Sequence, residues 1–256
     1  MYIRQTLWQR TRNLPRAKTP RAVVHIAISQ HRRHNRMTMG LLAWTKTVSY
    51  HSYREIERKD NMSDIKERFV TIYKEKIHRK GSEKLLEWLE KYDFFTAPAS
   101  TRFHSAFEGG LCRHSVLVYE RLRALFVNEF CKGKELTSEQ EETIAVVGLL
   151  HDLCKVQFYD VEMRNKKIDG QWQSVPTYVV NDKMPYGHGE KSVYLIKSFM
   201  GLTTDEAMAI RWHMGFSDVE FKGGGYNVSN AFNMYPLAVL AHVADLQATF
   251  LDEVEE

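Results

Sequence analysis

The chain has 256 residues, of which 43% are hydrophobic, and its formal net charge is +4, so it can form one sizeable core with an extension. Its three cysteines, Cys112, Cys131 and Cys154, form no C-x-x-C pair, which argues against a disulfide framework and a thiolate zinc site. No apolar run approaches the ~18 to 20 residues that a membrane span needs, so we expect a soluble, cytoplasmic protein with no membrane contact.

Residues 1–61 differ from the rest of the chain in charge. They contain 13 Lys and Arg but 3 Asp and Glu, whereas residues 62–256 contain 23 and 29, a net charge of −6. This composition predicts a basic, disordered extension, which would serve as a nucleic-acid-binding tail or a transit-like peptide. We favour another interpretation, a misassigned gene start, because "MSDIKERF" from Met62 opens a mixed, helix-compatible composition. The folded domain is therefore expected at 62–256.

From residue 62 onward, apolar residues recur every three or four positions, which is typical of helices. The pattern predicts helices at 63–80, 82–92, 111–127, 138–154, 189–200, 204–214 and 236–252. Thr203 and Glu206 match a capping box, and Pro236 suits a first helical turn. At 160–180, Asp169-Gly170 lies between polar and β-branched runs and predicts a hairpin. The expected fold class is all-α, with a small β-hairpin insertion.

Histidines and aspartates interrupt the apolar stripes of five predicted helices or lie at their ends. Burying an unpaired carboxylate or imidazole costs several kcal/mol, so such residues are expected on core faces only when they are paired or bind metal. No cluster of basic residues shares these faces, whereas a metal ion would neutralise the aspartates. Imidazole and carboxylate ligands suit manganese, iron, magnesium or zinc. The candidate ligands are His114, His151, Asp152, His188, His213 and Asp245.

The order of these ligands resembles that of the HD superfamily of metal-dependent phosphohydrolases, in the version with two histidines between the HD pair and the last aspartate. The resemblance extends to "GGLCRHS", "GLLHDLCK", "YGHGEKS" and "AHVADLQA" and covers about 104–252. The residue pattern is similar to that of the HD domain of certain bacterial 3′-to-5′ exoribonucleases. The resemblance therefore implies an HD-domain helical bundle that binds two divalent metal ions.

The resemblance also implies a role for individual residues. Asp152 would bridge the two metals, one completed by His114, His151 and Asp245 and the other by His188 and His213. A hydroxide between the metals would attack phosphorus, with Asp152 and Lys155 as the side chains expected to take part in catalysis. Lys155, at the lysine position of the family's HDxxK motif, would bind substrate phosphate, and His104 and Arg113 would also contact substrate.

Three functions remain open on the sequence alone. The first is hydrolysis of a phosphoester in a nucleotide or a nucleic acid, and the acidic body favours a small nucleotide as the partner. The second is a di-iron oxygenase of the inositol oxygenase type, which uses a similar ligand set. The third is a nucleotide-binding regulatory module with an idle site. The sequence says nothing of the oligomeric state.

Overall fold

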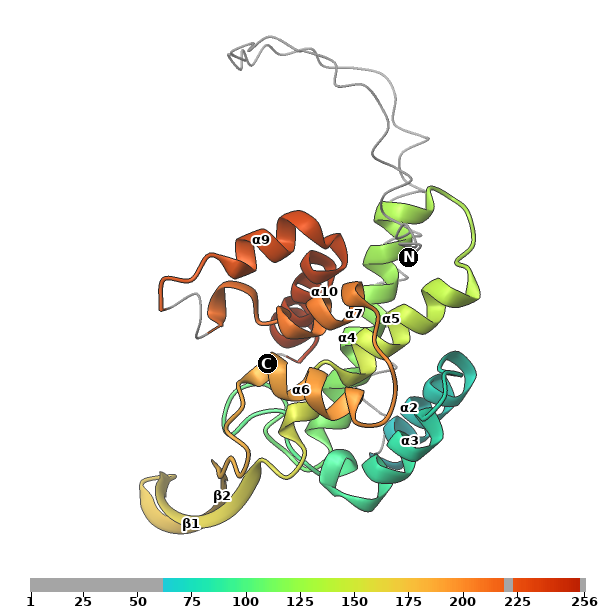
Figure 1. Ribbon diagram of the computed structural model, residues 1–256. Helices are drawn as coiled ribbons and strands as arrows, with labels where there is room; N and C mark the ends of the chain where they lie inside the picture. Colours follow the sequence, from blue (N-terminus) through green and yellow to red (C-terminus); the bar gives the residue numbers. More distant parts are fainter. Residues whose placement is uncertain (1–61, 219–222, 254–256) are drawn as a thin grey trace, which may run out of the picture. The chain divides into compact units, whose positions relative to one another are not determined.

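The structure is a computed structural model that describes residues 62–218 and 223–253 (Figure 1). The predicted extension at 1–61 lies outside the described residues. The described part is mostly helical, with one antiparallel hairpin. Its helices are α2 (Met62–Lys76), α3 (Ser82–Lys91), α4 (Gly110–Phe126), α5 (Ser138–Leu150), α6 (His188–Lys197), α7 (Thr204–Arg211), α9 (Asn227–Met234) and α10 (Pro236–Gln247); its strands are β1 (Tyr159–Ile168) and β2 (Gln171–Val180).

Helices α4 and α5 form the centre of the core. They pack against each other, α2 contacts both of them, and α10 packs on α4 and α7 (Figure 1). In α5 every residue from Ile144 to Leu150 is buried, so this helix has no exposed face in its second half. A helix that is apolar on all sides belongs inside the bundle, which explains why its neighbours cover it. This central position places the residues that follow α5 in the interior.

Gly148 lets α5 approach α4 closely. A Cβ atom at this position would lie 2.5 Å from the Cα of Tyr119 and 2.9 Å from its Cβ, closer than packed atoms tolerate. Both obstructing atoms are at or beside the α4 backbone, so a side chain could be accommodated only by moving one helix. The spacing of the two central helices therefore depends on a glycine.

Gly148→Ala is expected to lower the free energy of unfolding by about 1–3 kcal/mol, because overpacking outweighs the better helix propensity of alanine. Chemical denaturation measures this change. Gly201→Ala is the matched control, since a Cβ there meets no atom within 4 Å. An equal stability for both variants would contradict the close contact.

Helix ends and one further helix differ from the sequence expectation. The predicted helix at 138–154 ends at Leu150, because Asp152 leaves helical geometry (φ −101°, ψ 22°) and a 3₁₀ turn follows at Leu153–Lys155. Helix α9 was not predicted, since its asparagines and serine have low helix propensity. The hairpin is confirmed, with its turn at Asp169-Gly170, and so is the capping box of Thr203 and Glu206.

Among the described residues, no single helix is long and apolar enough to cross a membrane. Only α9 taken together with Pro236–Asp252 has the length and the apolar composition of a membrane span, and this pair is bent by 110°.

Candidate metal centre

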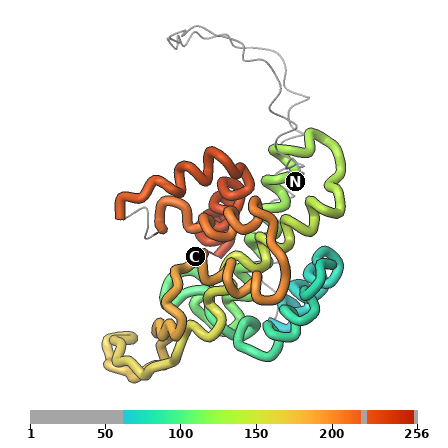
Figure 2. Tube along the Cα trace, viewed as in Figure 1, coloured from blue at the N-terminus to red at the C-terminus, as the bar shows by residue number. Residues whose placement is uncertain are grey.

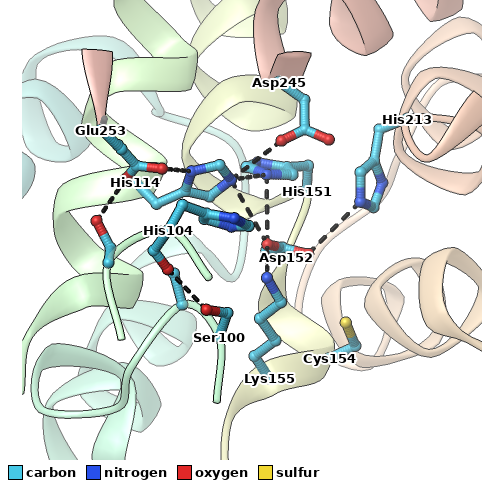
Figure 3. A network of polar contacts seen from close by, with 12 residues as sticks. Ser100, His104, His114, His151, Asp152, Cys154, Lys155, His213, Asp245 and Glu253 are labelled. Atoms are coloured by element: carbon cyan, nitrogen blue, oxygen red, sulfur yellow. Dashed lines mark hydrogen bonds and ion pairs between the residues drawn. The ribbon is translucent and has the colours of Figure 1, made fainter. Parts of the chain in front are cut away.

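The predicted ligands converge where several helices meet, and Figure 3 shows all of them except His188. His114 lies in the first half of α4, and His151 and Asp152 follow α5 directly. His188 is the first residue of α6, His213 lies just beyond α7, and Asp245 lies in α10. The bundle therefore brings side chains separated by up to 131 positions in the sequence into one cluster, in which four residues are buried and His188 and Asp245 are partly buried.

One half of the cluster contains His114, His151 and Asp245. The Nε2 atoms of His114 and His151 lie 3.2 Å apart. Nε2 of His114 also lies 3.2 Å from Oδ1 of Asp245. Oδ2 of Asp152 lies 3.7 Å from the Nε2 of His114 and 3.6 Å from that of His151. Two ring nitrogens and two carboxylates that face one another in this way form a donor set for a cation.

The other half contains His188 and His213. Oδ1 of Asp152 lies 2.8 Å from Nε2 of His188 and 3.5 Å from Nε2 of His213. Nε2 of His213 is buried and has no hydrogen-bond partner among the residues that the structure describes. A buried polar atom without a partner is costly, so this nitrogen fits a ligand that the protein itself does not supply. The two oxygens of Asp152 face different halves, as a carboxylate shared by two metals would.

Backbone carbonyls fix the orientation of two histidines. Nδ1 of His151 donates to the carbonyl of Gly148 at 2.9 Å, and Nδ1 of His213 donates to that of Ile210 at 2.7 Å. Because a carbonyl only accepts, each Nδ1 carries a proton, and in the neutral form of such a ring the lone pair of Nε2 is free to bind a metal. Burial lowers the pKa of His151 to about 3, which keeps this ring neutral.

The carboxylates at the centre are ionised and lie beside positively charged side chains. Although burial opposes its charge, the pKa of Asp152 is well below the usual range, because the Lys155 ammonium lies beside it and His188 hydrogen-bonds to it. Burial likewise opposes a charge on His114, but the carboxylates of Glu253 and Asp245 raise its pKa to about 10. Several ionised carboxylates in a buried site attract positive charge, which is the electrostatic requirement for binding a divalent ion.

A comparison with protein-family models matches the HD domain over residues 111–247, which is more than half of the chain. The chain belongs to the HD domain family. No match was found among the curated proteins or the solved structures. All six candidate ligands lie within the matched HD segment, from His114 in α4 to Asp245 in α10.

Glu253 contacts the cluster of six candidate ligands, the HD centre, from outside the matched segment. The sequence analysis missed this residue. Its buried carboxylate accepts from Nδ1 of His114 at 3.1 Å and from the hydroxyl of Ser105 at 2.7 Å (Figure 3). The pairing leaves Nε2 of His114 facing the other ligands. Glu253 lies eight positions after Asp245, so helical periodicity was a signal that could have found it. We assign Glu253 as a positioning residue for His114.

Cys154 is a second neighbour that the sequence analysis did not assign to the HD centre. Its Sγ lies 3.3 Å from Nδ1 of His188, and its backbone N–H donates to the hydroxyl of Ser192 at 3.0 Å. Burial disfavours a charged His188, yet Cys154 and Asp152 raise the pKa of this ring to about 10. The thiol thus contacts the ring nitrogen of His188 that points away from Asp152.

The HD centre opens into a cavity of about 650 Å³. Nζ of Lys155 lies 2.6 Å from Oδ2 of Asp152 and lines this cavity. His104 also lines it, with its ring centroid 5.1 Å from that of His114. Arg113 does not line the cavity; its guanidinium lies 5.9 Å from the centroid of the Phe107 ring. The structure therefore brings Lys155 and His104, but not Arg113, to the cavity beside the candidate ligands.

Glu253→Gln is expected to weaken metal binding by about 10- to 100-fold, since an amide holds the His114 N–H less strongly than a carboxylate does. Titration of the metal-free protein with Mn²⁺ or Zn²⁺, followed by calorimetry, measures this change. Glu135→Gln, an exposed carboxylate outside the HD centre, serves as the control. Unchanged affinity in Glu253→Gln would show that the contact has no positioning role.

Proposed function

We propose that this HD domain is a metal-dependent phosphohydrolase that cleaves a phosphoester of a nucleotide. The observation that carries the proposal is the cluster in which Asp152 directs its two oxygens to two groups of histidines. One group includes Nε2 of His213, a buried nitrogen that has no hydrogen-bond partner among the described residues. Such an arrangement suits a pair of divalent ions, and metal pairs are widely used to hydrolyse phosphoesters.

The residues fit two metal sites. His114, His151, Asp152 and Asp245 would hold one ion, and Asp152, His188 and His213 would hold the other. When bound, the ions would supply an activated water and charge neutralisation for attack at phosphorus. Manganese, iron, magnesium and zinc all accept these imidazole and carboxylate ligands.

Lys155 would bind the phosphoryl group. Its ammonium lies at the boundary between the cluster and the cavity, and it is the one lysine among the described residues that line the cavity. Burial disfavours its charge, but the adjacent Asp152 raises its pKa further above the usual range, so it stays protonated. A fixed positive charge beside the metal ligands suits a phosphate oxygen.

The remaining lining of the cavity favours a nucleotide. Aromatic rings from three segments line it, namely Phe103, Phe158 with Tyr159, and Phe250. Such rings provide stacking surfaces for a base, and a cavity of about 650 Å³ suits a small molecule. The excess of acidic residues in 62–256 disfavours a long polyanion. A nucleic-acid end, as in the exoribonucleases whose ligand order is similar, is the alternative substrate.

The test combines metal analysis with a substrate panel. Elemental analysis of the purified protein should find about two divalent ions per chain, and added Mn²⁺ should increase hydrolysis of nucleoside phosphates above that of bis(p-nitrophenyl) phosphate. Preferential hydrolysis of a short oligonucleotide would move the proposal to nucleic acid. Two irons with oxygen consumption and no hydrolysis would replace it with a di-iron oxygenase. Nucleotide binding without turnover would indicate a regulatory module, and absence of metal would overturn the proposal.

A further inference from the structure

The β1–β2 hairpin projects from the helical body and has an open edge (Figures 1 and 2). Every residue of β1 after Tyr159 is exposed, and within the described part of the chain β1 packs extensively only against β2. A two-stranded ribbon with ten paired rungs and little cover is marginally stable in water by itself. An exposed edge strand of this length is also a template for pairing with another strand.

Pro176 shows which backbone groups of β1 point outward. It lies opposite Met163, and because proline has no N–H the two residues cannot exchange both hydrogen bonds of a bonded pair. Met163 therefore directs its own N–H and C=O away from β2, toward the open edge. The edge of β2 is interrupted at Pro176, which protects it from pairing. The edge available to a further strand is that of β1.

The side chains on one face of β1 form a self-complementary charge pattern. Asp160, Glu162, Arg164 and Lys166 alternate along the strand and are all exposed. If a second β1 pairs antiparallel with Met163 opposite its own copy, Glu162 lies opposite Arg164 and Asp160 lies opposite Lys166. The two-fold symmetry repeats both pairs, so four pairs of opposite charges face each other across the strands.

No neighbouring register preserves this match. If the two-fold axis lies one residue away from Met163, either Glu162 or Arg164 is opposite its own copy. If the axis lies two residues away, side chains of like charge are opposite each other. Charges that only protected an edge from aggregation would have no need to match in a single register. The exposed contact of Arg164 with Glu162 in the same strand, at 3.3 Å, contributes little and can be exchanged for the contact between strands.

We propose that β1 is the interface between two copies of this chain, which pair antiparallel about Met163 to form a four-stranded sheet. The central Met163 residues exchange backbone hydrogen bonds, and the four charge pairs fix the register. Met163, which is 63% exposed in the single chain, contacts its own copy at the axis. The association does not depend on the proposed hydrolase activity, since none of these residues is a candidate metal ligand.

Analytical ultracentrifugation of the full chain across the micromolar range tests the proposal. The unaltered protein should dimerise, and Glu162→Arg should raise the dimer Kd by at least about tenfold, because it places two arginine pairs face to face. The double variant Glu162→Arg/Arg164→Glu should restore the original Kd, since it swaps the charges within each pair. Met163→Pro, which removes an outward N–H, should also prevent dimerisation.

Glu87→Arg is the matched control, because it makes the same change of charge at an exposed position of α3 and should leave the Kd unchanged. Circular dichroism confirms that each variant is folded. A monomeric unaltered protein would overturn the proposal. So would a dimer that persists in Glu162→Arg, or a double variant that stays as weak as the single one.

Discussion

Asp152→Asn is expected to reduce hydrolysis by at least about 10³-fold and to lower the metal content from two ions toward one or none. Both oxygens of Asp152 are engaged, Oδ2 toward His114, His151 and Lys155 and Oδ1 toward His188 and His213. An amide keeps the shape but supplies one neutral oxygen in place of a charged pair. The two groups of ligands then lose the carboxylate that joins them.

Metal content and turnover are measured on the same Asp152→Asn sample, and the thermal unfolding midpoint shows whether it is folded. Asp169→Asn, in the hairpin turn with φ 49°, is the control, because asparagine tolerates this conformation. A variant that retained two ions and full activity would refute the shared role of Asp152.

Lys155→Met is expected to lower kcat/KM by about 10²- to 10³-fold while the protein retains its metals. The charge of Lys155 would stabilise the phosphoryl group, and methionine keeps much of the volume of the side chain without this charge. Lys155→Arg should recover part of the activity, because it restores a positive charge near the same place.

The measurement separates substrate binding from support of Asp152. If Lys155 served only to hold Asp152, at 2.6 Å, its replacement would release metal as well as activity. Metal analysis of Lys155→Met therefore accompanies the kinetics, with Lys134→Met as an exposed control. Full activity in Lys155→Met would remove this residue from the proposed site.

The sequence predicted the parts of the fold that depend on local pattern. The apolar stripes located the helices from α2 to α7 and α10, and the Asp169-Gly170 turn located the hairpin. Where a helix ends was less predictable, because tertiary contacts decide it. Nδ1 of His151 bonds to the Gly148 carbonyl just where α5 ends, and no periodicity in the sequence reveals this contact.

In the candidate site, too, the sequence predicted what depends on local pattern but not what depends on tertiary contacts. The six candidate ligands interrupt apolar stripes or lie at helix ends, and the sequence showed them. Glu253 lies past the last predicted helix and touches His114 only because α10 and the helical turn at Ala248–Asp252 that continues it pack against α4. Arg113 is next to His114 in the sequence, but a step of ~100° around the helix turns it away from the cavity. Neighbours in space are set by packing between helices, which sequence spacing does not encode.

Gly148 sets the distance between α4 and α5, and its carbonyl also holds the ring of His151. One small residue thus links the distance between α4 and α5 to the orientation of the His151 ring. Redesign of the α4–α5 contact for heat resistance would change the geometry at His151 at the same time. A library of variants at this contact should therefore lose metal affinity and folding together, and libraries aimed at either property alone should leave Gly148 fixed.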